Sequence, residues 1–294
     1  MAGGVERSNL EKVFWPDSGL TKGDLLTYFE AVADVILPTL RDRPLTVKRY
    51  PDGIDGFSFF QKNTPKYAPS WVKTVQLWAG SARRDVHYTL CNSKRTLLWL
   101  ANQAAIELHP WLSRVDHLDR PDHLVFDLDP PPGQFDVAVK VALVLKDVLD
   151  ELGLEGLAKT SGAKGIHVYV PLNRRYGYDA TRQAAHIIAS EVETRIPNVV
   201  STEVKIVKRG GKLFLDTGRN GPGAHIAAPY SPRARAGATV SFPVAWDDVP
   251  NVRPEDFTIR TVPELLSSRG DLWRELMPRP QSLNRVVSRN AAVS

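Results

Sequence analysis

Two carboxylates stand one residue apart at Asp127 and Asp129, directly after the apolar run 124–126. In a β-strand alternate side chains share a face, so these acids would lie side by side while the apolar residues between them face a core. Neighbouring carboxylates repel each other unless a cation lies between them. Oxygen ligands of this kind suit Mg²⁺ or Mn²⁺. The motif therefore predicts a divalent-metal site or, as the simpler alternative, a strand end with two solvated acids.

A glycine-containing turn at 161–167 (SGAKGIH) combines a hydroxyl, a lysine and a histidine. Glycines let backbone N–H groups approach an anion closely, and Ser161 and Lys164 add a donor and a positive charge. In the strand that follows, His167 and Tyr169 share one face. We therefore expect a phosphate-binding turn, against the alternative of a hairpin whose lysine and histidine are merely exposed.

A third strand-end acid closes the segment 212–216 (KLFLD). Alternation directs Phe214 and Asp216 to the face opposite the leucines. A lone aspartate at a strand end is usually a turn residue. Beside Asp127 and Asp129, however, it would complete a three-carboxylate site for two metal ions, which lie ~3.5–4 Å apart in phosphoryl-transfer enzymes.

The composition favours a polyanionic partner and an intracellular setting. The 294 residues carry 38 Lys and Arg against 33 Asp and Glu, a formal net charge of +5, and the basic residues occur in clusters. Such clustering is typical of proteins that bind polyanions, although most adjacent basic pairs are ordinary solvated surface. Cys91 is the one cysteine, which excludes an intramolecular disulfide and a Cys-rich zinc site. We find no apolar leader and no membrane-length stretch, and expect a cytoplasmic, nucleoid-associated protein without membrane contact.

Helices and strands mix without strict alternation, which favours an α+β fold over a doubly wound sheet. Thr21 would cap the first helix with Asp24 in its first turn, and Asp179 would cap a later one. The expected helices span 22–37, 94–109, 134–152, 180–195 and 262–276. Besides the strand that ends at Asp129, the expected strands span 44–50, 156–160, 166–171, 203–207 and 212–216. Residues 279–294 lack periodicity and would form a loose C-terminal tail.

In this order, the three motifs resemble the polymerase domain of bacterial ligase D, a branch of the archaeo-eukaryotic primase superfamily. That family has an hhhDhDP strand, an SGxKGxH turn and a late hhhD strand. The likeness covers about residues 8–276, with departures at 129–133 (DPPPG) and 217–220 (TGRN). Further matches are LEKVFWP at 10–16, LTKGDL at 20–25, KRYPDG at 48–53, FFQK at 59–62, ELH at 107–109 and APYSPRAR at 228–235.

The resemblance implies a central antiparallel β platform with flanking helices, in a primase-polymerase catalytic domain at 1–278. It also implies template-directed addition of NTP or dNTP, with two Mn²⁺ or Mg²⁺ ions, in non-homologous end joining. The DNA would have short gaps or broken ends with a 5′-phosphate. Since the chain shows no K-x-D-G ligase motif, a stand-alone member is expected, working with a separate ligase and an end-binding protein.

The resemblance also assigns roles to individual residues. The catalytic metal ligands would be Asp127, Asp129 and Asp216. The incoming triphosphate would contact Ser161, Lys164 and His167, with His109, Lys48, Arg233 and Arg235 nearby. The DNA would be bound by Lys12 and Lys22, at the 5′-phosphate and beside the free N–H groups of a helix N-terminus, and by Phe59 and Phe60, which would stack against the template.

Two other functions fit parts of the same pattern. A primase that starts strands de novo would use the same active site, although Cys91 excludes the fused zinc module common in dedicated primases. A non-catalytic DNA-end-binding module that recruits a ligase is the alternative from another class. The three carboxylates argue against it, because a binder of phosphates gains nothing from three acids on one half-buried face.

Overall fold

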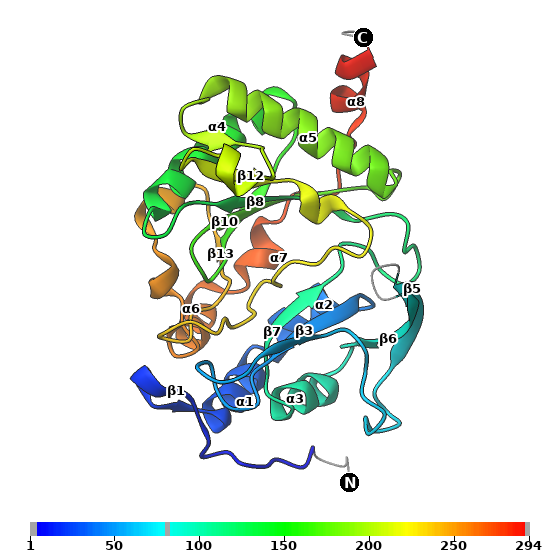
Figure 1. The fold of residues 1–294 in the computed structure, drawn as a ribbon, viewed down its shortest axis with the longest axis vertical. Coiled ribbons are helices and arrows are strands. Elements are labelled where there is room, and N and C mark those ends of the chain that lie inside the picture. The colour runs from blue at the N-terminus through cyan, green and yellow to red at the C-terminus, as the bar shows by residue number, and fades with distance from the viewer. Residues whose placement is uncertain (1–4, 80–82, 292–294) are drawn as a thin grey trace. The chain divides into compact units, whose positions relative to one another are not determined.

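The computed structural model describes residues 5–79 and 83–291, which form two compact units (Figure 1). Unit 1 takes its residues from 1–116, 225–242 and 255–271, and unit 2 from 117–224, 243–254 and 272–294. Each unit has its own large sheet, and the predicted α+β class with antiparallel sheets is confirmed. Among the described helices, none is both long and apolar enough to cross a membrane.

In unit 1 the strand β3 (Pro44–Arg49) organises a five-stranded sheet. It pairs antiparallel with β4 (Phe59–Gln61), β6 (Arg84–Leu90) and β7 (Ala105–Pro110), and β6 pairs with β5 (Thr74–Ala79). The other elements of this unit are a hairpin and four helices: β1 (Val13–Trp15), β2 (Leu20–Thr21), α1 (Lys22–Ala31), α2 (Ala33–Leu40), α3 (Lys94–Asn102) and α6 (Thr261–Arg269).

In unit 2 six strands form one sheet, antiparallel except for its first pair. Its order is β11 (Val200–Ser201), β12 (Leu213–Asp216), β8 (His123–Asp129), β10 (Ile166–Pro171), β9 (Leu157–Thr160) and β13 (Pro243–Val244). In Figure 1, α4 (Phe135–Glu151) and α5 (Tyr178–Arg195) cover one face of this sheet, and α7 (Leu272–Leu276) lies on the other side. The last helix, α8 (Asn284–Ala291), packs against α5.

The alternation predicted for β8 and β12 is present. Leu124, Phe126 and Leu128 are fully buried, whereas Asp127 and Asp129 are only partly buried. The leucines of β12 are buried in the same manner, and Phe214 and Asp216 are partly exposed. One face of the sheet is therefore sealed under α4 and α5, and the acids project from the other.

The helix predicted at 94–109 is wrong in its second half. The helix α3 ends at Asn102, and Ala104 adopts a left-handed backbone with φ 61° that ends it. Residues 105–110 are the buried strand β7 instead, because a short apolar run fits a buried helix and a buried strand equally well. As a result, Glu107 and His109 share one face of a strand.

Other predicted boundaries shift for local reasons. The helix at 22–37 is two helices that meet at Val32, and the helix at 262–276 is interrupted at Gly270, where φ is 74°. The strand at 203–207 is absent and a 3₁₀ turn lies at Ile206–Lys208. Asp179 lies in the first turn of α5, whose N-cap is Gly177.

The C-terminal residues described here are more ordered than the loose tail predicted for 279–294. The side chain of Gln281 exchanges hydrogen bonds with the backbone of Glu155, at 2.8 Å in each direction. Leu283 and Val286 are buried, and residues 284–291 are helical. This segment therefore packs against unit 2.

Cys91 lies fully buried in unit 1. Burial disfavours the charged thiolate and raises the pKa of this thiol well above its usual range. The cysteine is therefore a small core residue without nucleophilic character.

Candidate active site

Five polar side chains on one face of the sheet of unit 2 form what we call the acid row: four stand in one line across the strands, and Asp129 lies beside them. The strand register places Lys159 of β9 opposite His167 of β10, His167 opposite Asp127 of β8, and Asp127 opposite Asp216 of β12. Asp129 lies two residues further along β8, on the same face. Backbone pairing thus brings together the three predicted acids, the outermost of which are 89 residues apart in sequence (216 − 127).

Two basic side chains neutralise the three acids. Arg219 Nε lies 3.5 Å from Asp127 Oδ2 and 3.4 Å from Asp216 Oδ2, so its guanidinium bridges two carboxylates. Lys164 Nζ lies 2.9 Å from Asp129 Oδ1. Both cations are partly exposed, at 42–43% of their side-chain surface. The sequence signal for Arg219 was the extra basic residue in TGRN, three positions after Asp216.

The two paired acids differ in their protonation behaviour. Burial alone would raise the pKa of Asp127, but His167, Arg219 and Lys159 outweigh it and lower the pKa to about 2. Burial raises the pKa of Asp216, and the charges of Asp127 and Asp129 add to this effect, against the Gly218 N–H and Arg219. Asp127 is therefore a fixed anion, whereas Asp216 is the acid that most gains from a further cation.

The donor chemistry of this face fits divalent ions. Three ionisable carboxylates project from one side of the sheet and repel one another, and hard oxygen donors of this type bind Mg²⁺ or Mn²⁺. Within the described ranges, no three His, Cys, Asp or Glu side chains are grouped closely enough to form a ready metal site. Each acid contacts Arg219 or Lys164 instead, so ions would take over the places of these two exposed cations.

His167 is buried within the acid row rather than exposed. Its Nδ1 lies 2.9 Å from Lys159 Nζ and its Nε2 lies 3.3 Å from Asp127 Oδ1. Sequence analysis missed Lys159, which is fully buried, although its alternation with His167 across a hairpin could have indicated it. His167 orients Asp127 in this structure, and its predicted contact with a triphosphate stays a prediction.

The predicted phosphate turn is held together by its own serine. Ser161 Oγ accepts hydrogen bonds from the backbone N–H groups of Ala163 and Gly165, both at 3.1 Å. A Cβ on Gly165 would lie 2.1 Å from the carbonyl oxygen of Leu128, so a glycine is required for β8 and β10 to approach. Ser161 thus shapes the turn, and Lys164 projects from it to Asp129.

A second cluster of predicted residues lies in unit 1, around a glutamate that sequence analysis did not single out. The register places Phe60 of β4 opposite Lys48 of β3, and Lys48 opposite Glu107 of β7. His109 is two residues further along β7, and its Nε2 lies 3.0 Å from Glu107 Oε2. Arg233 Nε lies 3.2 Å from the same oxygen. We call these five residues the Glu107 cluster.

Two further predicted residues of unit 1, Phe59 and Arg235, lie outside this cluster. Phe59 stacks on Phe57, with ring centroids 5.6 Å apart, and Arg49 lies 5.5 Å from the centre of the Phe59 ring. Phe57 and Phe60 are exposed aromatic surfaces. Arg235 is exposed, two residues beyond Arg233.

The two lysines predicted to hold a 5′-phosphate have protein partners. Lys12 Nζ lies 2.7 Å from Asp52 Oδ1. Lys22 is buried and its Nζ donates to the backbone oxygen of Ser8 at 2.6 Å. Burial, with the charges of Lys12 and Arg49, lowers the pKa of Lys22.

The helix N-terminus beside these lysines is closed. The predicted cap is confirmed, because Thr21 and Asp24 form a reciprocal capping box. The N–H groups of Lys22 and Gly23 donate to the backbone oxygens of Lys12 and Leu10, both at 2.8 Å. The expectation that free N–H groups of this helix receive a phosphate is therefore wrong.

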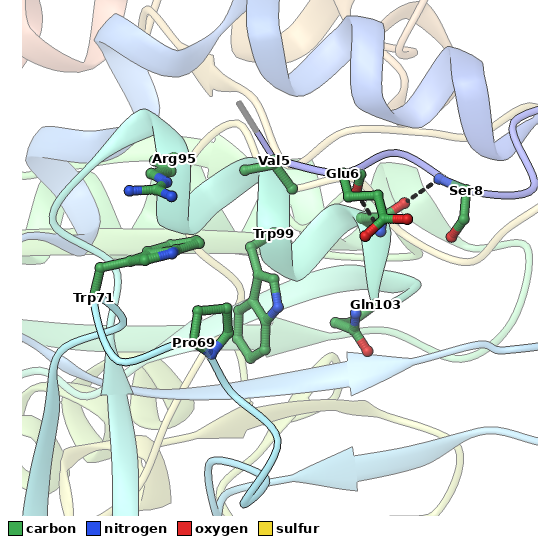
Figure 2. A pocket seen from close by; sticks show the side chains of 9 residues that line it. Val5, Glu6, Ser8, Pro69, Trp71, Arg95, Trp99 and Gln103 are labelled. Atoms are coloured by element: carbon green, nitrogen blue, oxygen red, sulfur yellow. Dashed lines mark hydrogen bonds between the residues drawn. The ribbon is translucent and has the colours of Figure 1, made fainter. Parts of the chain in front are cut away.

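A pocket of about 420 Å³ lies elsewhere in unit 1 (Figure 2). The helix α3 supplies Arg95 and Trp99, and the N-terminal segment supplies Glu6. The Arg95 guanidinium lies 4.0 Å from the centre of the Trp71 ring. All residues that line this pocket belong to unit 1.

Known proteins are similar to this chain in sequence and fold. Residues 21–273 match the family described as LigD, primase-polymerase domain. The chain is 37% identical over 280 residues to the bifunctional non-homologous end joining protein LigD of Bacillus subtilis, covering 94% of this chain and 45% of that protein. It is 33% identical over 293 residues to the multifunctional non-homologous end joining protein LigD of Pseudomonas aeruginosa, covering 97% and 34% respectively.

A solved structure agrees with these relatives. The polymerase domain from Mycobacterium tuberculosis ligase D in complex with DNA matches with a TM-score of 0.85 and 31% sequence identity, covering 92% of this chain and 97% of that one. The chain therefore belongs to the LigD primase-polymerase domain family, whose members are metal-dependent nucleotidyltransferases. It spans less than half the length of the curated relatives that it matches.

Proposed function

We propose that this chain extends DNA strands by template-directed addition of NTP or dNTP, at short gaps and broken ends that carry a 5′-phosphate. The observation that carries the proposal is the acid row, in which Asp127 and Asp216 face each other with Asp129 beside them. The relatives are named for non-homologous end joining, and the structural relative is a polymerase domain in complex with DNA.

Asp127, Asp129 and Asp216 would hold two divalent ions, with Mn²⁺ preferred. When bound, the ions would lower the pKa of the primer 3′-hydroxyl and neutralise the triphosphate and the leaving pyrophosphate. His167 orients Asp127 from behind through its Nε2. Asp127 is already ionised at neutral pH, because its pKa is about 2.

Lys164 and Arg219 would exchange partners when the site fills. Both now neutralise carboxylates, and both are partly exposed, so their contacts are readily broken. Ions bound to the acids would release the ammonium and the guanidinium toward phosphate oxygens. An arginine can contact two such oxygens at once, whereas a lysine acts as a point charge.

Unit 1 would supply contacts to nucleotide phosphates and to the template. Lys48, His109, Arg233 and Arg235 are basic groups on or beside the Glu107 cluster. The exposed rings of Phe57 and Phe60 offer stacking surfaces, worth ~1–3 kcal/mol per base and tolerant of sequence. Such contacts suit an enzyme that must act on breaks of any sequence.

Strand sealing and an end-binding protein would complete the repair, since the relatives are described as bifunctional or multifunctional proteins of end joining. Repair of chromosomal breaks would place the protein with the nucleoid in the cytoplasm.

Primer extension on a gapped duplex with a 5′-phosphate and Mn²⁺ tests the proposal. Wild-type protein should extend the primer, and Asp127→Ala or Asp216→Ala should reduce extension by at least ~10³-fold, because each removes a ligand of the reacting centre. Affinity for the same DNA should remain within about twofold. Asp179→Ala is the matched control. This aspartate of α5 is almost fully exposed and forms an ion pair with Arg182 on the same helix.

Near wild-type extension by either acid variant would overturn the two-metal assignment. A parallel reaction without primer separates gap filling from de novo priming, because only a primase yields product there. DNA binding without any extension by the wild type would favour the end-binding module.

A further inference from the structure

Glu107 is a buried carboxylate that the proposed chemistry does not use. It is 5% exposed, on a strand whose other residues are all buried. A buried carboxylate is costly unless it is paired and hydrogen-bonded. The buried charge of Glu107 therefore requires partners that compensate it.

Both oxygens of Glu107 are fully engaged. Oε1 accepts hydrogen bonds from the Tyr50 hydroxyl at 3.0 Å and from the Ala234 backbone N–H at 3.3 Å. Oε2 lies 3.0 Å from His109 Nε2 and 3.2 Å from Arg233 Nε. The carboxylate of Glu107, on β7, thus joins Tyr50, directly after β3, to the segment that carries Arg233.

The glutamate is a permanent anion. Burial would raise the pKa of Glu107, but the hydrogen bond from His109, the charges of Arg233 and His109, and the Ala234 N–H together hold the pKa well below its usual range. Its Tyr50 partner is a fixed donor, because burial and the neighbouring Glu107 charge raise the pKa of that phenol well above its usual range.

The same contacts reach the aromatic residue proposed for the template. Lys48 Nζ lies 5.2 Å from the centre of the Tyr50 ring and 5.4 Å from that of Phe60. The Phe60 ring meets His109 edge-on, with centroids 5.7 Å apart. The contacts therefore close a ring from Glu107 through Tyr50, Lys48, Phe60 and His109 back to Glu107.

We propose that Glu107 is a positioning residue, which fixes His109 and Arg233 as one preformed surface for the phosphates of the incoming nucleotide and holds Phe60 in register with them. The role rests on the proposed function, since it concerns the nucleotide that the enzyme would use. Fixing long basic side chains before the ligand arrives reduces the entropy that binding must overcome.

Positioning and net charge predict opposite effects of removing this carboxylate. Glu107→Gln leaves one positive charge more around the cluster, so a purely electrostatic surface would bind polyphosphate more tightly. Loss of positioning would weaken binding instead, because Arg233 and His109 lose the anion that orients them. Asp85→Asn is the matched control: this exposed acid of β6 also lies in unit 1, and its amide can keep the contact with Gln76.

Calorimetric titration with inorganic tripolyphosphate at one fixed salt concentration provides the first readout. We expect Glu107→Gln to weaken binding about tenfold, and Asp85→Asn to leave it unchanged or slightly tighter. In primer extension, Glu107→Gln should raise KM for the nucleotide about tenfold with kcat within about twofold. Glu107→Asp, which keeps the charge on a shorter side chain, should recover part of the loss.

Unchanged or tighter tripolyphosphate binding by Glu107→Gln would overturn the proposal, as would a fall in kcat at constant KM. Tyr50→Phe decides the matter if Glu107→Gln does not fold, because it removes one hydrogen bond to Glu107 without a change of charge. It should weaken binding about threefold, and unchanged binding would also overturn the proposal. Failure of the wild type to extend primers would reject the proposed function, whereas the binding comparison would still test the role of Glu107.

Discussion

The acid row of unit 2 and the Glu107 cluster of unit 1 use the same architecture with opposite charge. Each is built on a line of side chains across antiparallel strands, fixed by backbone register. In the acid row, three acids are neutralised by Lys164 and Arg219, which are 42–43% exposed. In the Glu107 cluster, one acid is enclosed by basic partners, and Arg233 is only 18% exposed.

Exposure decides which ion pairs can be exchanged. A pair near the surface is worth about 0–1 kcal/mol, so an ion or a phosphate can replace either partner. Breaking a buried pair costs about 3–5 kcal/mol, because a charge is left without compensation. The acid row is therefore suited to change its cations during a reaction cycle, and the Glu107 cluster is suited to keep them.

Among substitutions outside the three acids, the largest effect should come from breaking the register on which the acid row depends. Gly165→Ala would place a Cβ 2.1 Å from the Leu128 carbonyl oxygen, which forces β8 and β10 apart. We expect a loss of about 1–3 kcal/mol in the free energy of unfolding and about a hundredfold loss of extension, since a shift of ~1 Å at a reacting centre can cost that much. Denaturant unfolding and primer extension measure the two.

Gly177→Ala provides the control for this substitution. Gly177 caps α5 in the same unit, and a Cβ there would meet its nearest neighbour at an ordinary 3.7 Å. Equal losses for the two variants would show that the close approach of β8 and β10 does not matter.

Substitutions of Lys164 and His167 should distinguish substrate binding from catalysis at the acid row. Lys164→Ala removes an exposed charge available to phosphates and should raise KM about tenfold. His167→Ala removes the group that orients Asp127 and should lower kcat about tenfold. Steady-state kinetics with varied nucleotide concentration separates the effects on KM and kcat. If both variants change KM alone, His167 is a phosphate contact, as the family resemblance implies.

Arg219→Gln should increase the affinity of the protein for Mn²⁺. The guanidinium now bridges Asp127 and Asp216, and an incoming ion has to displace it. Since an exposed ion pair is worth 1 kcal/mol or less, the expected gain is roughly two- to fivefold. Electron paramagnetic resonance of free Mn²⁺ in the absence of DNA measures it. Weaker Mn²⁺ binding would show that Arg219 supports the metal site rather than competing with it.

The smallest expected effect concerns Lys12, which already has a partner in Asp52. Lys12→Ala should weaken binding of gapped DNA with a 5′-phosphate about threefold, with less effect on the same DNA with a 5′-hydroxyl. Lys22→Ala should instead lower stability, because Lys22 is buried on the Ser8 carbonyl. Binding of both DNAs at one salt concentration tests the difference, and equal losses for Lys12→Ala would exclude a phosphate pocket.

Sequence alone predicted the parts of the site that depend on local alternation. The face of Asp127 and Asp129 and the face of Asp216 follow from the two-residue period of strands, and both are present. The cap at Thr21 was equally local, because Thr21 and Asp24 are three residues apart. Such features require no knowledge of the rest of the fold.

Features that depend on long-range pairing were missed. Lys159 and Glu107 resemble surface residues in the sequence, and only the pairing of β9 with β10 and of β3 with β7 buries them beside their partners. The prediction of a helix in the second half of 94–109 was wrong for the same reason, because this apolar run pairs with β3 as a strand. The division of the strands between the large sheets of the two units also follows from pairing preferences that local patterns do not encode.

The burial of Cys91 has a practical consequence for fluorescence measurements. Cys91 is the one cysteine of the sequence, and its thiol is buried in the core. In the folded protein a maleimide dye would therefore react only with a cysteine introduced at the surface. Trp78→Cys, on β5 of unit 1, and Val207→Cys, in unit 2, replace exposed side chains outside the proposed sites. A dye at either position would report on events in its own unit, so that DNA stacking and metal-linked changes can be followed as separate optical signals.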